Sequence, residues 1–190
     1  MQVVKLIITL LVIAYSGYLA YGSFKTHNYK DLVMAIVLIG LLTLTNFVAI
    51  VFVSGPSMQP NFQTGDCILV LRSSKVERFD IAVVNFQNRK LIKRVVGMPN
   101  ESISLTDGKT FINGQSIEEP FKYHEGNSNI TNLKVGSDQI FVIGDNRLNS
   151  KDSRYFGPVP TTEIYGKMIY RFKILSKIPF LAKIIHAITG

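Results

Sequence analysis

Apolar residues are distributed unevenly along this chain of 190 residues. The segment 32–53 contains no charged residue, and its 22 residues would span roughly 30 Å as a helix, which matches the hydrocarbon thickness of a bilayer. It therefore predicts a transmembrane helix. The segment 6–24 is also uncharged but contains tyrosines and glycines, so it is either a second span or an interfacial segment.

Basic residues predict how these segments are oriented. Lys25 and Lys30 precede the second segment, whereas no Lys or Arg follows it before Arg72. Positively charged short loops stay in the cytoplasm, so residues 25–31 form a cytoplasmic loop and the chain after residue 53 faces outward. Cleavage of a signal peptide is disfavoured, because no small-x-small site ends the first segment and a stronger span follows.

Beyond residue 53 the apolar runs shorten to strand length and alternate with turn residues. The expected strands are Ile68–Leu71, Ile81–Phe86, Leu91–Val96, Ser102–Leu105, Ile140–Ile143 and Ile164–Tyr170. Asp107-Gly108 and Asn113-Gly114 indicate tight turns around Thr110–Ile112. We predict a mainly β domain over residues 54–170, a compact antiparallel sheet or barrel, with residues 120–137 as a polar connection.

The net charge of +8 is concentrated at the C-terminus. Residues 54–170 carry fourteen basic and twelve acidic residues, so this domain lacks the excess of basic residues that is typical of nucleic-acid binding. Residues 171–190 carry four basic residues and no acidic one. Apolar residues recur there at helical spacing, which suits either an interfacial helix on anionic lipid or core packing. Cys67 is the only cysteine, so no intramolecular disulfide can form.

A candidate nucleophile, Ser57, lies in the segment Ser54–Pro60, directly after the second apolar segment. Gly55 and two prolines restrict the backbone around this hydroxyl. A serine in such a turn becomes a nucleophile when a base lies within hydrogen-bond distance. Without a base it would only cap amides of its own loop.

A candidate base is Lys93, which lies within the apolar run Leu91–Val96. Burial would lower the pKa of its amine from about 10.4, and a neutral amine can accept the serine proton. A solvated surface lysine is the competing interpretation. Arg94 is excluded as the base because a guanidinium stays protonated. His124, the only histidine between residues 54 and 170, lies in a polar stretch that suits a triad poorly.

A third segment, Gly144–Pro160, is dense in turn-forming, charged and hydroxyl residues between two apolar runs. Together the three segments resemble the type I signal peptidases, which are bacterial membrane-bound serine–lysine proteases. The matching residues are Ser57, Met58 and Pro60; Gly65 and Asp66; Lys93 to Pro99; and Gly144 to Arg147, Ser150, Asp152 to Arg154 and Phe156 to Pro160. The likeness covers nearly all of residues 51–170, and two leading apolar segments suit the family.

The resemblance implies roles for these residues. Ser57 is the nucleophile, Lys93 is the general base, and the Ser150 hydroxyl orients the lysine amine. The supporting residues are Asp145, Asn146, Asp152, Arg154 and Arg94. In this family the backbone N–H of the nucleophile forms the oxyanion hole, and some members add a hydroxyl two residues earlier. That position is Gly55 here, so the chain would depend on the Ser57 amide.

The resemblance also implies the substrate and its binding mode. The family removes signal peptides from exported precursor proteins after a small-x-small sequence, which requires shallow apolar pockets and an extended substrate. The residues expected to line the pockets are Val53, Met58, Phe62, Leu91 and Ile92. No cofactor or metal is implied, because no cluster of His, Cys, Asp and Glu has ligand spacing. We expect a monomer in the bacterial plasma membrane, with its catalytic domain on the extracytoplasmic face.

Other functions are compatible with parts of this pattern. A specialised processing peptidase of one export system would have nearly the same sequence. A membrane-tethered module that binds exported peptides without cutting them would not need Ser57 and Lys93. A mitochondrial inner-membrane relative fits the Gly144–Arg147 segment less well. A self-cleaving repressor protease would carry a DNA-binding domain in place of the apolar segments.

Overall fold

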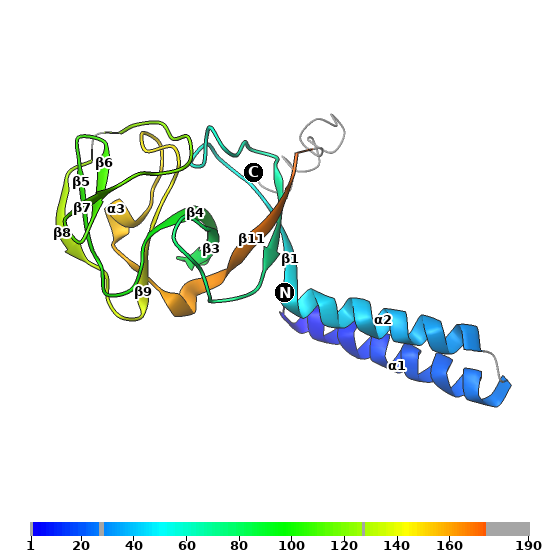
Figure 1. Ribbon diagram of the computed structural model, residues 1–190. Coiled ribbons are helices and arrows are strands. Elements are labelled where there is room, and N and C mark those ends of the chain that lie inside the picture. Colours follow the sequence, from blue (N-terminus) through cyan, green and yellow to red (C-terminus); the bar gives the residue numbers. More distant parts are fainter. Residues whose placement is uncertain (1, 27–28, 127, 174–190) are drawn as a thin grey trace. The chain divides into compact units, whose positions relative to one another are not determined.

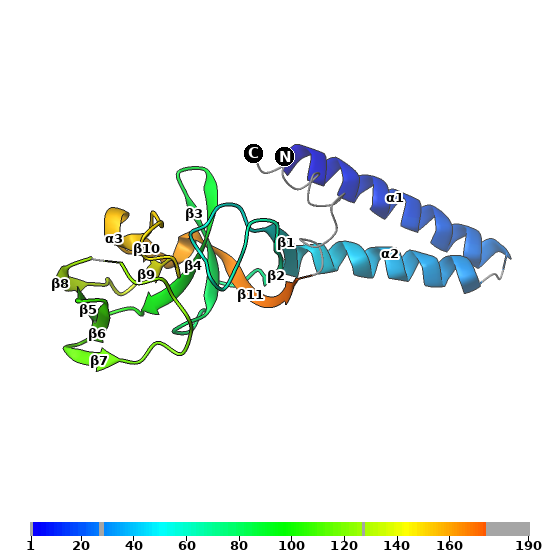
Figure 2. The same cartoon turned by 90° about the horizontal axis from the view of Figure 1, so that it is seen from above.

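The computed structural model describes residues 2–26, 29–126 and 128–173, and the chain divides into two compact units, 1–49 and 50–190. The first unit consists of helices α1 (Gln2–Thr26) and α2 (Tyr29–Phe47), which lie side by side in both views (Figures 1 and 2). Of the predicted basic tail 171–190, residues 174–190 lie outside the described residues.

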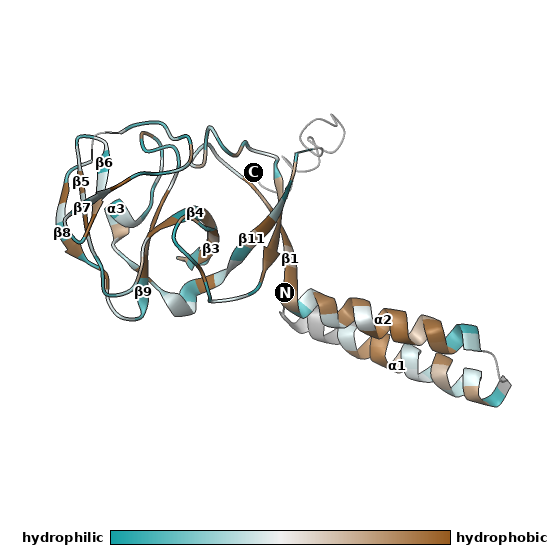
Figure 3. Ribbon diagram, viewed as in Figure 1, coloured by the Kyte–Doolittle hydropathy of each residue, from teal (hydrophilic) through white to brown (hydrophobic). Residues whose placement is uncertain are grey.

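Helix α2 is the one helix among the described residues that is long and apolar enough to cross a membrane. Most of its residues are hydrophobic (Figure 3). The predicted span 32–53 is too long at its C-terminal end, because the helix stops at Phe47 and Val48–Phe52 form strand β1. The cause is that β1 is itself apolar and rich in β-branched residues, so a continuous apolar run conceals the change from helix to strand.

The second unit contains a seven-stranded sheet in the order β1-β2-β11-β3-β4-β9-β10. Its strands after β1 are β2 (Cys67–Leu71), β3 (Ile81–Phe86), β4 (Arg89–Gly97), β9 (Gln139–Ile143), β10 (Val159–Pro160) and β11 (Ile164–Phe172). The pairs β2–β11, β11–β3, β3–β4, β4–β9 and β9–β10 are antiparallel. This confirms the predicted mainly antiparallel β fold. Strand β11 continues two residues beyond the predicted domain boundary at 170.

A four-stranded sheet in the order β7-β6-β5-β8 accompanies the first. Its strands are β5 (Ser102–Thr106), β6 (Lys109–Ile112), β7 (Gln115–Ile117) and β8 (Ile130–Lys134). The predicted turns at Asp107-Gly108 and Asn113-Gly114 connect β5, β6 and β7, and both residues of each turn have positive φ, as two-residue hairpin loops require. The predicted polar connection 120–137 is wrong in part, because it contains β8.

Three clusters of buried side chains hold the second unit together. One includes Ile68, Val70 and Val83 of the large sheet, and a second includes Ala82, Val95 and Val142. A third joins the two sheets, because Phe141 and Ile143 of β9 belong to the same cluster as side chains of β5 and β6. Helix α3 (Ser153–Phe156) and the short 3₁₀ helix Thr161–Glu163 lie on either side of β10 in the chain. Strand β4 contributes to all three clusters and is therefore a rigid platform for the site.

Candidate active site

Ser57 lies in a tight turn that follows β1. The turn is closed by hydrogen bonds from the Gln59 amide to the Pro56 carbonyl (3.0 Å) and from the Phe62 amide to the Met58 carbonyl (2.9 Å). Gly55 has φ of +84°, a conformation that glycine adopts without strain. The chain path predicted from glycine and proline is therefore formed around the serine hydroxyl.

Lys93 projects from the middle of β4, and its Nζ donates a hydrogen bond to the Oγ of Ser57 at 2.7 Å. The lysine is 3% exposed. Burial lowers the pKa of its amine from 10.5 to about 8, because a charged amine loses hydration there. The structure thus brings the predicted nucleophile and the predicted base together.

Three charged groups modify the pKa of Lys93 less strongly than its burial does. The carboxylates of Asp152 and Asp145 raise the pKa, and the guanidinium of Arg154 lowers it. Both carboxylates are already ion-paired with arginines, Asp152 with Arg154 at 2.8 Å and Asp145 with Arg94 at 2.6 Å. Desolvation therefore dominates, and a substantial fraction of Lys93 is neutral near pH 8.

The segment Gly144–Asn146 packs against the serine turn. The Asn146 amide donates to the Ser57 carbonyl at 3.0 Å, and its side chain donates to the Pro56 carbonyl at 3.2 Å. A Cβ at Gly144 would lie 2.5 Å from the Ser57 carbonyl oxygen, so only glycine allows this close approach. Asn146 therefore has the supporting position expected from the sequence.

Ser150 is buried beside Gly144. A Cβ added at Gly144 would lie 2.2 Å from the Oγ of Ser150. Within the described part of the chain, its Oγ has no hydrogen-bond partner. The expected hydrogen bond to Lys93 is therefore not formed in this structure.

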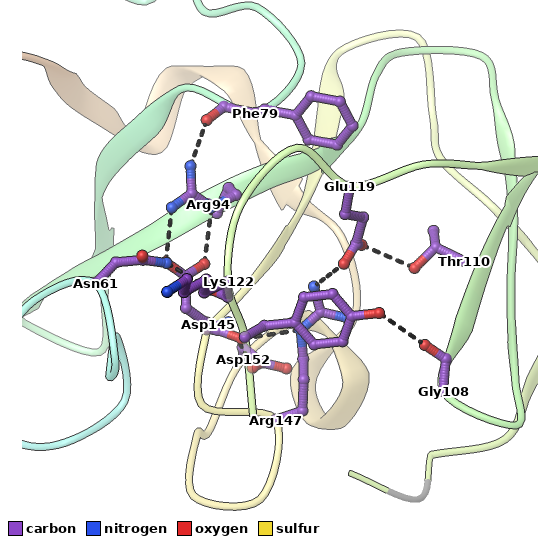
Figure 4. A network of polar contacts seen from close by, with 12 residues as sticks. Asn61, Phe79, Arg94, Gly108, Thr110, Glu119, Lys122, Asp145, Arg147 and Asp152 are labelled. Atoms are coloured by element: carbon purple, nitrogen blue, oxygen red, sulfur yellow. Dashed lines mark hydrogen bonds and ion pairs between the residues drawn. The ribbon is translucent and has the colours of Figure 1, made fainter. Parts of the chain in front are cut away.

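The predicted supporting residues form two buried ion pairs. Arg94 donates from Nε and Nη2 to the two oxygens of Asp145, at 2.7 and 2.6 Å, and from Nη1 to the Phe79 carbonyl at 2.9 Å (Figure 4). Asp152 caps helix α3 and accepts hydrogen bonds from Arg154 and from the Gly144 amide (2.9 Å). Both pairs therefore brace the loop that contacts the serine turn.

Several residues of this network were not assigned from the sequence. Arg147 pairs with Glu119 at 2.7 Å (Figure 4). Its guanidinium lies 4.6 Å from the ring centre of Tyr123. The Ser153 hydroxyl accepts a hydrogen bond from the Val142 amide at 3.0 Å. Asn61 donates to Asp145 at 2.7 Å. The polarity of Asn61 and Glu119 was visible in the sequence, but partners 84 and 28 residues away were not.

The residues expected to line the substrate pockets do not form one group. Val53, Met58, Phe62 and Ile92 lie in one buried cluster, and each is at most 8% exposed. Leu91 packs against a different cluster, because alternation along β4 directs it to the opposite face. Their contact with a substrate remains a prediction.

A groove of about 540 Å³ lies at the tip of the β3–β4 hairpin, between that tip and the chain around β10. It is lined by residues including Phe86, Arg89, Lys90, Phe156 and Glu163. None of the five predicted pocket residues lines it, and neither Ser57 nor Lys93 does. This groove is therefore separate from the serine and lysine side chains.

The fold and the site define a class of protein: a mainly antiparallel β protein in which a serine hydroxyl lies beside a buried amine of lowered pKa. Such an amine can take a proton from the hydroxyl and so activate it as a nucleophile. Among the residues that the structure describes, no three His, Cys, Asp or Glu side chains are grouped so that they could hold a metal ion.

Comparison with known proteins identifies the family. The sequence model of the family described as signal peptidase, peptidase S26, matches residues 26–173, which is most of the chain. The chain belongs to this family, and it is an enzyme, a serine peptidase of the signal peptidase I type.

Two curated relatives agree with this assignment. The chain is 38% identical over 133 residues to signal peptidase I V of Bacillus subtilis (strain 168), covering 60% of this chain and 79% of that protein. It is 32% identical over 151 residues to signal peptidase I of Bacillus caldolyticus, covering 70% and 81%. The crystal structure of a signal peptidase I from Enterococcus faecalis V583 matches with a TM-score of 0.43 and 32% identity, over 49% of this chain and 96% of that one.

Proposed function

We propose that this enzyme removes N-terminal signal peptides from exported precursor proteins, with Ser57 as nucleophile and Lys93 as general base. One observation carries the proposal: the Nζ of a lysine that is 3% exposed lies 2.7 Å from a serine hydroxyl. In the neutral form of the lysine, the direction of this hydrogen bond reverses and the hydroxyl donates. The amine is then correctly placed to accept the proton.

The reaction proceeds in two steps with balanced proton transfers. Ser57 Oγ attacks the scissile carbonyl carbon while its proton moves to Lys93 Nζ. The amide C–N bond then breaks, and the leaving amine takes that proton from the lysine. In the second step Lys93 Nζ takes a proton from water while the water oxygen attacks the acyl carbon; the ester C–O bond to Ser57 then breaks, and Ser57 Oγ takes that proton from Lys93.

Developing negative charge on the carbonyl oxygen requires donors. We assign the Ser57 backbone N–H to this role, since Gly55 has no hydroxyl to contribute. The unpartnered Ser150 hydroxyl is assigned to hold the lysine amine once that amine is protonated. A pre-placed buried hydroxyl is suited to this, because it needs no further desolvation when the charge forms.

Membrane anchoring of the enzyme is supported by the surface of its helices. Large apolar side chains on α2 are exposed, such as Ile36 at 61% and Leu41 at 57%. Among the described residues the buried positions of the helix pair are small: Ser16, Ser23 and Ala35. Small residues at a helix contact and large apolar residues outside it are typical of membrane helices. We place the enzyme as a monomer in a bacterial plasma membrane, with its catalytic domain outside the cytoplasm.

The test is cleavage of a secretory precursor whose signal peptide ends in Ala-x-Ala by the full-length enzyme in detergent. Ser57→Ala and Lys93→Ala should each lower kcat by about 10³-fold or more with an unchanged circular dichroism spectrum. The wild-type rate should rise with pH through about 8, as Lys93 loses its proton. Retention of activity by Lys93→Ala would refute the assignment of the base. Precursor binding by wild type without cleavage would favour a tethered binding module.

A further inference from the structure

Asn61 connects the serine turn to the network that supports the base. It lies four residues after Ser57, and its Nδ2 donates two hydrogen bonds, to Asp145 Oδ2 at 2.7 Å and to the Lys122 carbonyl at 2.6 Å (Figure 4). Both hydrogens of the side-chain amide thus have an acceptor. Its own carbonyl accepts a hydrogen bond from Arg171, whose guanidinium also pairs with Asp66. The position of Asn61 is therefore fixed on both its main chain and its side chain.

These contacts close a ring that contains the two reacting groups. Asn61 bonds to Asp145, and Asp145 forms a bidentate ion pair with Arg94. Arg94 is the neighbour of Lys93 in β4, and the Nζ of Lys93 contacts Ser57. The short stretch of chain from Ser57 to Asn61 completes the ring. The distance between nucleophile and base is thus set by a closed chain of short contacts rather than by the sheet alone.

Asn146 holds the start of the turn, and Asn61 attaches its other end. The Asn146 amide donates to the Ser57 carbonyl at 3.0 Å, and its side chain donates to the Pro56 carbonyl at 3.2 Å. Met58 and Phe62 are buried in a core cluster. Asn61 adds side-chain hydrogen bonds to Asp145 and to the Lys122 carbonyl, so the end of the turn is held by the carboxylate that pairs with Arg94. Asparagine suits the position because it is neutral and has two donors that face two acceptors.

We propose that Asn61 is a positioning residue that holds the Ser57 hydroxyl against the Lys93 amine through Asp145. This proposal rests on the proposed function. It predicts that substitution of Asn61 lowers kcat rather than raising KM, since Asn61 acts on the spacing between nucleophile and base. It does so through Asp145, the acidic partner of Arg94, without contacting the nucleophile itself. A misplacement of reacting groups by about 1 Å can lower a rate by about 100-fold.

The test compares two substitutions at Asn61 with a matched control in the full-length enzyme. Asn61→Ala removes both donors, and Asn61→Asp keeps the shape of the side chain but offers no donor to Asp145 or Lys122. Asn113→Ala is the control, because it removes one side-chain hydrogen bond, to the Ser102 amide at 2.9 Å, in the four-stranded sheet. We measure kcat, KM and the pH profile on an Ala-x-Ala precursor, at a temperature below the Tm of every variant.

Both Asn61 variants should lower kcat by about 10- to 100-fold with KM nearly unchanged. The pH midpoint of Asn61→Ala should stay near that of wild type, because the burial that lowers the pKa of Lys93 remains. Asn113→Ala should lower Tm and leave kcat unchanged. If wild type cleaves and the Asn61 variants keep kcat within about twofold, Asn61 has only a structural role and the positioning proposal is wrong. If wild type does not cleave, the proposed function fails first.

Discussion

Two adjacent cations on strand β4 have opposite environments. Lys93 and Arg94 are both buried, and alternation along the strand directs them to opposite faces of the sheet. Arg94 meets a carboxylate, the bidentate Asp145, together with the Phe79 carbonyl and the ring of Phe121, whose centre is 3.8 Å away. Lys93 meets a hydroxyl, that of Ser57, and the carboxylates around it are paired with arginines.

In the proposed mechanism, this difference lets one strand supply both a support and a base. A buried cation with a bidentate carboxylate partner stays charged and fixes the geometry. A buried cation with a neutral partner tends to lose its proton, which is the requirement for a general base. Residue type and burial therefore separate the two side chains: a guanidinium keeps its proton, whereas burial lowers the pKa of the Lys93 amine to about 8.

The largest expected effect comes from replacing Lys93 with arginine, so that both neighbouring residues on β4 carry a guanidinium. Lys93→Arg keeps a positive charge at the position, but a guanidinium does not lose its proton at any accessible pH. We expect kcat to fall by about 10³-fold or more across the pH range, measured on an Ala-x-Ala precursor. Circular dichroism provides the control for folding. Cleavage by this variant that rises with pH as in wild type would show that Lys93 is not the base.

The next effect tests the supporting cation. Arg94→Met leaves the Asp145 carboxylate buried, 0% exposed, without its ion pair. Breaking a buried pair in this way costs about 3–5 kcal/mol, so we expect a correspondingly lower free energy of unfolding in urea. The double variant Arg94→Met/Asp145→Asn should recover part of this loss, because it removes the unpaired charge. Equal stability of Arg94→Met and wild type would contradict the structural role of the pair.

The smallest effect is a pH-dependent gain in stability from Lys93→Met. The pKa of Lys93 is lowered from 10.5 to about 8 in the folded state, so burial of the charged amine destabilises wild type below about pH 8. Met has no such cost and should raise the free energy of unfolding there by at most about 3 kcal/mol. Between pH 8 and 10.5 the folded protein releases its proton before the unfolded chain does, so wild type becomes more stable and the advantage of Met shrinks. A difference that does not change with pH would contradict the lowered pKa.

Much of the fold could be predicted from local pattern. Strand β3 has the predicted bounds, and the predicted runs within β4 and β9 lie at most two residues inside the observed strands. The hairpin turns were recognised because Asp-Gly and Asn-Gly pairs favour positive φ. Strand β8 was missed because only Ile130 and Leu133 are apolar, their spacing does not alternate, and its other residues are polar and exposed, so its pairing with β5 makes it a strand. The strand β1 was missed for the opposite reason, since it continues an apolar helix.

The candidate site was predictable as a set of residues but not as a set of contacts. Ser57, Lys93 and the Gly144–Pro160 segment were selected by composition and by resemblance, and the structure brings them together. Their chain separations range from 36 to 90 residues in the contacts described, which no local pattern encodes. Asn61 and Glu119 were overlooked because a polar residue in a loop has no distinguishing mark until its partner is known.

The sequence by itself indicated the chemistry that we propose, through a serine in a glycine–proline turn, a lysine in an apolar run and the family resemblance that these residues share with the Gly144–Pro160 segment. It also determined the antiparallel character of the domain through short apolar runs and hairpin turns. Only the tertiary structure decided what surrounds the two neighbouring cations, the arginine that residue chemistry excludes as a base and the lysine that it favours. That decision depends on which groups face each side of β4, and long-range packing alone places a carboxylate beside Arg94 and a hydroxyl beside Lys93.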